Sequence, residues 1–436
     1  MNPEHRRAGR LITAAILAVL IATLTPASAN VPTSGPWCLL CGQAGTIDAL
    51  QNVVLLLPLG FGLAWRRWSR GATAVAAFAL SAFVETMQFT LIPGRDASLG
   101  DLLFNTIGGV LGFALQRANL DPLRPGLRAA IALRAGAGVT WMLALLVAAF
   151  GLRPAVPPGP PEEWATIIPF DSADGRYFSG SVRAIDVNGA RFLFSGPSAL
   201  GRVQSELGAR PSTITVEIQP GRPTSEYATI VAVQAGKVHP FSFGQSSREL
   251  RCQRFLAASA ILLRTPVFVL PSAFPPAAPP VEEAGDSYVL HCIWTDGHMI
   301  VRRVSAGGFA EVSVPLTPGL GWTLFLPAEL GASGAQTRSL AFIWLVLIAA
   351  PLGFWSRTPP RPVVPLDSSP PYTHASGWVP PLLLLFTLLL AQYAFPAFAG
   401  TAPSPVGEYL ATVSGFLLGM SLAHLMRSRH PFTIGS

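Results

Sequence analysis

The chain has 436 residues, of which 50% are apolar and only 12% are charged. Soluble globular domains carry about 25% charged residues, so this composition excludes an ordinary soluble enzyme and indicates a membrane protein. The formal net charge is +7, and nearly all the basic residues are arginines because Lys237 is the only lysine. The arginines flank apolar runs instead of forming a soluble basic face. We therefore predict that they set membrane topology, and we expect no nucleic-acid partner.

Apolar stretches of about 20 residues, long enough to cross a hydrocarbon core, recur along the chain. The first follows Arg6, Arg7 and Arg10 and ends at Ala27-Ser28-Ala29, a pattern that also fits a cleaved signal peptide. A retained first helix gives about eight transmembrane helices, and cleavage leaves one fewer. The expected stretches are residues 11–26, 49–65, 71–92, 101–116, 130–151, 338–356, 378–398 and 407–426.

The short connections between these stretches alternate in arginine content. Every second connection carries arginines, and the others hold only Arg95 or none. Because loops rich in arginine stay on the cytoplasmic side, we expect both termini in the cytoplasm. The arginines that set this orientation are Arg66, Arg67, Arg70, Arg117, Arg124, Arg128, Arg357, Arg361, Arg427 and Arg429.

A long insert, residues 153–337, lies between the fifth and sixth apolar stretches on the expected outer side. Its short β-type runs, separated by turn residues, are typical of a β-sandwich or jelly roll. Residues 266–280 are rich in Pro and Ala and are expected to form a long loop. Trp294, Asp296 and His298 lie on an expected hairpin, where turn formation is favoured over binding. The expected strands are residues 212–218, 228–233, 261–263, 288–294 and 299–304.

The sequence thus predicts a polytopic α-helical membrane protein with an inserted extracytoplasmic all-β sandwich. Residues 1–152 are expected to carry five helices, residues 153–337 the sandwich, and residues 338–436 three helices. The segment 100–112 is weakly similar to the segment 407–419, and Gln88 has a counterpart in Gln392. A degenerate duplication, a common theme in transporters, and chance glycine spacing both remain open explanations.

Acidic and amide side chains gather near the expected outer ends of three consecutive apolar stretches. Ionisable groups within a membrane are energetically unfavourable and by default mark function. Glu85 must pair, bind a cation or be protonated, and Arg95 is its natural partner. Asp48 and Asp101 also suit the starts of helices, where the dipole favours acids, so structural and ligand-binding roles both stay open. The candidate residues are Asp48, Asn52, Glu85, Gln88, Arg95, Asp96, Asp101 and Asn105.

Small residues and prolines mark places where helices are expected to pack closely or bend. Gly108 and Gly112 form a GxxxG pair, which favours close helix contact, and Gly60 adds a third small residue. Pro58 lies inside an apolar stretch and is expected to kink it.

Four cysteines occur, as Cys38-x2-Cys41 and as the separated Cys252 and Cys292. The first pair allows a local disulfide, free thiols, or metal or redox chemistry, and the second allows a disulfide within the sandwich. The seven histidines are scattered, with no HExxH spacing. We therefore expect no metal site and no cofactor.

The polar residues and glycines above resemble, in order and spacing, the VanZ-like family, which is named after a teicoplanin-resistance membrane protein. The resemblance covers about residues 11–118. It implies a bacterial envelope protein associated with antibiotic resistance, and it favours a retained first helix because Thr23-Leu24-Thr25-Pro26 is normal there. The motifs are Asp48-x3-Asn52, Leu57-Pro58-Leu59-Gly60-Phe61-Gly62, Glu85-x2-Gln88, Arg95-Asp96 and Asp101-x3-Asn105-x2-Gly108-x3-Gly112.

The insert is similar, more weakly, to a concanavalin A-like (LamG-like) sandwich, and such domains bind sugars or proteins. No calcium-ligand run or aromatic platform marks a sugar site. The segments that carry this resemblance are residues 212–220, 229–231, 241–245 and 262–265.

Together these features favour a non-enzymatic envelope protein whose outer polar site binds a lipid-linked, cell-wall or glycopeptide-type ligand. One alternative is a membrane enzyme acting on a lipid-linked substrate with Asp48, Glu85 and Asp101 as acid/base or metal-binding carboxylates. Another is a small transporter with two related halves. The expected location is the bacterial inner membrane, and the expected partners are membrane lipid and a cell-wall glycan or lipid-linked precursor. The oligomeric state stays open.

Overall fold

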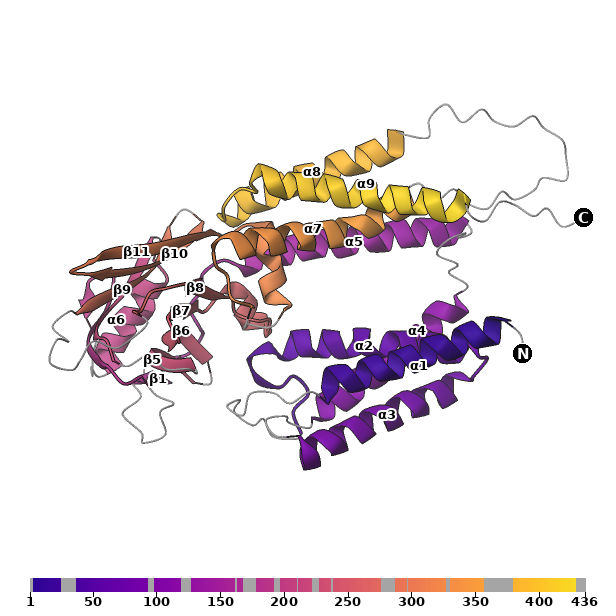
Figure 1. The fold of residues 1–436 in the computed structure, drawn as a ribbon, viewed down its shortest axis with the longest axis horizontal. Coiled ribbons are helices and arrows are strands. Elements are labelled where there is room, and N and C mark those ends of the chain that lie inside the picture. The colour runs from indigo at the N-terminus through magenta and orange to yellow at the C-terminus, as the bar shows by residue number, and fades with distance from the viewer. Residues whose placement is uncertain are drawn as a thin grey trace, which may run out of the picture. The chain divides into compact units, whose positions relative to one another are not determined.

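The chain folds into two compact units, one ending at Ile131 and the other beginning at Ala132. Figure 1 shows the helices and strands of both units, coloured along the chain. The computed structural model describes residues 3–24, 37–92, 98–118, 127–160, 163–167, 178–191, 197–209, 211–221, 227–236, 238–275, 287–295, 297–326, 330–356 and 379–428.

The first unit is a bundle of four helices. Its apolar core is formed by one face each of α1, α2 and α3, and α4 packs along α2 and α3. Ser69 and Ser98 cap the third and fourth helices by accepting hydrogen bonds from backbone N–H groups three residues on, as N-cap residues do. The helices are α1 (Pro3–Thr23), α2 (Gly45–Trp65), α3 (Arg70–Leu91) and α4 (Leu99–Arg117).

Helices α2 and α4 pack backbone against backbone. A Cβ atom added at Gly108 would collide with the carbonyl oxygen of Val53, and one at Gly112 with that of Leu57. In return, a Cβ at Gly60 would collide with the carbonyl oxygen of Gly109. Small residues permit this close approach where no hydrophobic effect drives helices together. Glycine therefore fixes the depth at which the polar side chains of α2 and α4 meet.

The described residues contain seven helices that are long and apolar enough to cross a membrane, α2 to α5 and α7 to α9. The chain is therefore a multi-pass membrane protein. Helix α1 is not among the seven because its first half carries Arg6, Arg7 and Arg10. It nevertheless packs into the core of the first unit through Ala15 and Val19.

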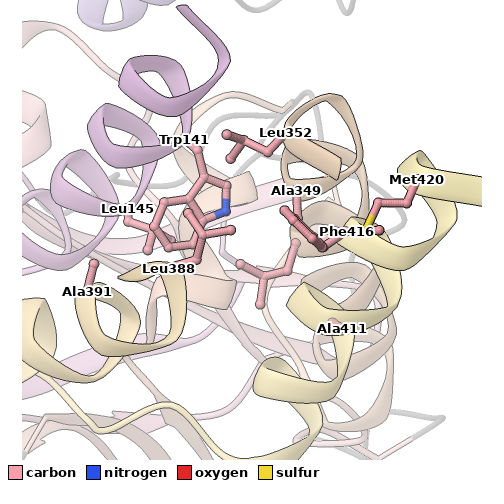
Figure 2. Packing of buried hydrophobic residues seen from close by; sticks show 10 residues of the cluster. Trp141, Leu145, Ala349, Leu352, Leu388, Ala391, Ala411, Phe416 and Met420 are labelled. Atoms are coloured by element: carbon pink, nitrogen blue, oxygen red, sulfur yellow. The ribbon is translucent and has the colours of Figure 1, made fainter. Parts of the chain in front are cut away.

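The second unit has its own helical bundle. Figure 2 shows Trp141 and Leu145 of α5 packed among apolar side chains of α7, α8 and α9. We expected α5 to group with the first four helices. Its buried side chains Trp141 and Leu145 instead contact apolar side chains of the later helices. The helices are α5 (Leu127–Gly151), α7 (Gly334–Ser356), α8 (Val379–Ala399) and α9 (Val406–Ser428).

A β-sandwich lies between α5 and α7 in the chain. One sheet has the order β1-β5-β6-β7-β8 and the other β11-β10-β9-β4-β2-β3, with every neighbouring pair antiparallel. Alternate residues of β4 and β9 are buried, as expected for strands with one face on a core. The strands are β1 (Trp164–Ile167), β2 (Ser181–Val187), β3 (Ala190–Arg191), β4 (Ser212–Gln219), β5 (Tyr227–Ala235), β6 (Val238–Ser246), β7 (Glu249–Arg254), β8 (Val267–Leu270), β9 (Tyr288–Thr295), β10 (His298–Ser305) and β11 (Gly308–Pro315).

Two local predictions in the insert are wrong, and one helix was not predicted. Residues 261–263 are not a strand, because they end the 3-10 helix η3 (Ala257–Ile261) and Leu262 has a left-handed φ of 57°. The expected loop 266–280 contains β8. A short helix, α6 (Pro197–Leu207), was not expected inside the all-β insert. Residues 261–263 and 267–270 are short apolar runs, whose periodicity does not separate strand from helix or turn. The segment of α6 alternates apolar and polar residues with a helical period, a signal that sequence reasoning missed.

Candidate functional site

The centre of the site is a hydrogen bond between α2 and α4. Asn52 donates from Nδ2 to the carboxylate Oδ1 of Asp101. Asp101 is held at the start of α4 because its backbone N–H donates to Oγ of the N-cap residue Ser98, at 3.0 Å. The glycine packing between the two helices sets this meeting point.

Glu85 of α3 joins the same site from a third helix. Its Oε2 accepts a hydrogen bond of 3.0 Å from the backbone N–H of Ser98. It also lies close enough to Asp101 for the two carboxylates to interact electrostatically. An acid of α3 and an acid in the first turn of α4 therefore lie close to each other. Such a pair favours a cation, a shared proton or a ligand rich in hydrogen-bond donors.

One helical turn beneath these acids lies an amide. Asn105, only 4% exposed, donates from Nδ2 to Oγ of Ser81 at 3.0 Å. Its Oδ1 is buried and has no hydrogen-bond partner among the described residues. A buried acceptor without a donor is energetically unfavourable. The amide oxygen is therefore an available acceptor at the floor of the site.

The remaining predicted residues divide into three groups. Asp48 lies one turn before Asn52 in the first turn of α2 and is half-buried. Gln88 instead donates to the backbone oxygen of Thr23, at 2.9 Å, and ties α3 to α1. Arg95 and Asp96 lie outside the described residues. The described part of the site thus contains acids and amides but no basic side chain.

No group of three or more potential metal ligands of the His, Cys, Asp or Glu type occurs among the described residues. What the described site offers is a set of oxygen acceptors on rigid helices, namely two carboxylates and the free oxygen of Asn105. Hydroxyl, amide N–H and ammonium groups are the natural partners of such a set.

The second unit holds one buried acid in its helical bundle. Glu408, 6% exposed, accepts hydrogen bonds from the hydroxyl of Thr317 and from the backbone N–H of Gly319. One turn deeper, Thr412 donates to Oε1 of Gln392 at 2.8 Å. The partners of Glu408 come from the segment leaving the sandwich and from η5 (Pro318–Leu324). This carboxylate is therefore occupied by the protein itself.

Within the sandwich, the most deeply buried charge is Arg254, 1% exposed. Its guanidinium donates to the hydroxyl of Ser212 and to the carbonyl oxygen of Leu207 at the end of α6. Burial lowers the pKa of Arg254 to about 10. These contacts join the two sheets and α6, so they hold the sandwich together.

The cysteines form two disulfides, one in each unit. Cys38 is bonded to Cys41, just before α2. Cys252 on β7 is bonded to Cys292 on β9, which links the two sheets. Both bonds brace the protein and leave no free thiol in the described chain.

Strands β9 and β10 form the hairpin that carries Trp294 and His298. Gly297 has a left-handed φ of 74° in its turn, and Trp294 is buried in the sandwich. Asp296 lies outside the described residues.

Sequence reasoning missed Ser81, Ser98 and Thr23, which complete the contacts of the site. Two signals were present in the sequence. Ser98 lies three residues before Asp101, the spacing of an N-cap with an acid in the first turn. Ser81 lies one turn before Glu85, on the same face of α3.

The comparisons with known proteins identify one part of this chain. The VanZ/LLP1 family model matches residues 3–119, which comprise α1 to α4 and the whole polar site. No curated protein and no solved structure matches the chain, so the likeness of the sandwich to concanavalin A-like domains stays a prediction. The four-helix unit at the start of this chain is a VanZ-like domain.

Proposed function

We propose that this protein is a non-enzymatic component of the bacterial envelope that binds a lipid-linked, cell-wall or glycopeptide-type ligand at the polar site of its VanZ-like domain. The observation that carries the proposal is the convergence of Asn52, Glu85 and Asp101 from three helices. In addition, the buried Oδ1 of Asn105 has no hydrogen-bond partner among the described residues, which leaves an acceptor for a ligand. The link to teicoplanin resistance rests on the family resemblance.

The orientation in this proposal follows the arginines. The polar site and the sandwich face the outside of the inner membrane, and both termini lie in the cytoplasm. Helix α1 is retained, because the family match begins at residue 3 and α1 contributes Ala15 and Val19 to the domain core. Cell-wall precursors are exposed on that outer side, which makes them accessible to the site.

The proposal assigns a different role to the second unit. Helices α5, α7, α8 and α9 are a degenerate copy of the VanZ-like set that anchors the sandwich and carries no ligand site. In support, Glu408 is already bound by Thr317 and Gly319. The sandwich then adds contacts to glycan or protein next to the membrane.

The test is ligand binding by the full chain in lipid nanodiscs. Wild-type protein is titrated with a soluble lipid-linked muropeptide precursor and with teicoplanin, alongside Glu85→Gln and Asp101→Asn. Thr90→Val is the control, because Thr90 is exposed at the same end of α3 and bonds only to the backbone oxygen of Thr86. The site variants are expected to lose binding at least ten-fold and the control none.

The same preparation separates the alternatives. Turnover of the lipid-linked precursor that disappears in Glu85→Gln would replace the binding role by an enzymatic one. Full teicoplanin resistance in cells that carry correctly inserted Glu85→Gln and Asp101→Asn would overturn the site and leave a scaffold. A blank glycan array with the full-length protein would remove the sugar-binding role of the sandwich.

A further inference from the structure

A second feature of the VanZ-like domain lies at the opposite end of its helices from the polar site. The first half of α1 and the end of α2 enclose a groove of about 540 Å³. Four basic side chains line its mouth, His5, Arg6 and Arg10 from α1 and Arg66 just after α2. The groove is formed because Gly62 lets α2 approach Ile12 of α1, which brings Arg66 beside the first turns of α1.

The groove changes character along its length. Beyond Arg10 its wall consists of Thr13, Ala14 and Leu17, all of them exposed in the bundle. At 1.5 Å per residue, Leu17 lies roughly 10 Å along the helix from Arg10. The apolar segment of α2 ends at Trp65, directly before Arg66. The basic mouth is thus at the membrane surface and the apolar wall runs into the bilayer.

Among the described residues, no acidic side chain forms an ion pair with the basic residues of the groove, and no acid belongs to the lining. Guanidinium groups bind phosphate through paired N–H donors, and basic pockets between membrane helices bind anionic headgroups.

We propose that this groove is a binding site for one anionic phospholipid. The phosphate is held by Arg6, Arg10 and Arg66, and one acyl chain lies along Ala14 and Leu17. The apolar wall selects a lipid over a free phosphate, which would use the mouth alone. The bound lipid adds a second link between α1 and α2 at this end of the domain, beside the contact of Gly62 with Ile12, and this role is independent of the ligand at the polar site.

The simpler explanation is that these arginines act only through the general attraction of a basic surface to an anionic membrane. Arg7 separates the two explanations. It lies beside Arg6 on the same turn of α1 and is exposed, but it is outside the groove lining. Arg6→Gln and Arg7→Gln therefore remove the same charge from the same end of the same helix.

The experiment is native mass spectrometry of the full-length protein titrated with phosphatidylglycerol. Arg6→Gln, Arg10→Gln and Arg66→Gln are each expected to weaken retention of the first lipid about five-fold, from roughly 1 kcal/mol per basic residue at a membrane surface. The triple variant is expected to retain none, and Arg7→Gln is expected to match wild type. Phosphatidylcholine and glycerol phosphate are the comparison probes.

Three results would overturn the proposal. One is an equal loss in Arg7→Gln, which would mean a general surface effect. Another is equal retention of phosphatidylcholine, which would mean no selectivity for charge. The third is displacement of the lipid by glycerol phosphate at equal concentration, which would mean a phosphate site without an acyl groove. The melting temperature of each variant, measured in the same detergent, separates loss of lipid from loss of fold.

Discussion

Helices α2 and α4 of the first unit and helices α7 and α9 of the second pack through the same contacts. Cβ atoms added at Gly108 and Gly112 would collide with backbone oxygens of α2, and those added at Gly415 and Gly419 with backbone oxygens of α7. The reverse contact also recurs, since Gly60 meets Gly109 and Gly353 meets Phe416. The contacting residues of α9 are numbered 307 positions after those of α4, and the contacting residues of α7 293 positions after those of α2.

The side chains placed by this shared packing differ. Asp101 of α4 corresponds to Glu408 of α9, and Asn105 to Thr412. On the facing helix, however, Asp48 and Asn52 correspond to Ala341 and Leu345, which are apolar. The polar partners in α2 have thus no equivalent in α7.

The acid of the second unit is bonded instead to the segment between the sandwich and α7. The acid of the first unit is bonded to a helix side chain and lies beside a second acid. The glycine contacts therefore set the position of each acid along its helix. The residues around the acid determine whether other parts of the protein bind its carboxylate or whether the carboxylate can also bind a ligand.

The largest expected effect distinguishes the disulfides of the two units. Replacing Cys252 and Cys292 together by alanine is expected to lower stability by about 4 kcal/mol, because the bond closes a 40-residue separation. Replacing Cys38 and Cys41 is expected to lower it by about 2 kcal/mol, since only 3 residues separate them. Thermal unfolding followed by circular dichroism measures both. Equal shifts would contradict the unequal role of the two bonds.

The next effect tests the shared packing. Gly112→Ala and Gly419→Ala are each expected to destabilise the protein by about 3 kcal/mol, because the new methyl group would overlap a backbone oxygen that is unable to move alone. Gly71→Ala is the control, since a Cβ at that position of α3 has open space around it. Alanine is also the better helix former there. If only one of the two packing variants kept its stability, the glycine contacts of the two bundles would not be equivalent.

The third effect tests the difference between the two acids. Glu408→Leu is expected to cost about 2 kcal/mol, because the hydroxyl of Thr317 and the N–H of Gly319 lose their acceptor in a buried place. Asp101→Asn is expected to change stability by less than about 1 kcal/mol, because the new amide oxygen still accepts from Asn52. Chemical denaturation in mild detergent measures both. An Asp101→Asn variant as unstable as Glu408→Leu would make Asp101 a structural acid.

Much of the helical architecture could be predicted from the sequence, because a span needs about 20 apolar residues and little else. The grouping of helices could not. Helix α5 follows the VanZ-like domain in sequence, yet Trp141 and Leu145 pack with α7 and α8. An apolar sequence identifies a membrane-spanning helix but does not show which other helix it contacts. Lipid tails are as apolar as leucine side chains, so the hydrophobic effect does not favour one neighbour over another.

The polar site was predictable in its residue types and only partly in its contacts. Acids and amides at one turn's spacing predicted that three consecutive helices carry polar side chains at one level. The partner predicted for Glu85 was Arg95, which lies outside the described residues. The partner of Gln88 is a backbone oxygen of α1, which no side-chain pattern encodes. The bond of Glu408 to Thr317 joins residues far apart in sequence, so only the tertiary fold reveals it.

The smallest expected effect is a pH dependence of stability that the sandwich shows and the membrane helices do not. His291 on β9 lies between Thr215 of β4, whose hydroxyl is 3.1 Å from its Nδ1, and Arg302 of β10. Burial, and then the positive charge of Arg302, lower the pKa of His291 below its ordinary value of 6.5. Arg302 is itself paired with Glu311 of β11. The folded sandwich therefore disfavours a second positive charge at this position.

A folded-state pKa below the unfolded value means that the unfolded chain takes up the proton first as the pH falls. The sandwich is thus expected to keep its full stability above pH 6.5 and to lose stability as the pH decreases through 6.5 toward the lower folded value. His291→Gln, which cannot be charged, is expected to reduce this dependence, and the remainder is expected from His239 of β6, whose pKa burial also lowers. Helices α5 and α7 contain no acidic residue and no histidine, so hydrogen exchange between pH 7.5 and 5.5, corrected for the intrinsic rate, should accelerate in β4 and β9 but not in α5. The same acceleration in His291→Gln would assign the pH dependence to another group of the sandwich.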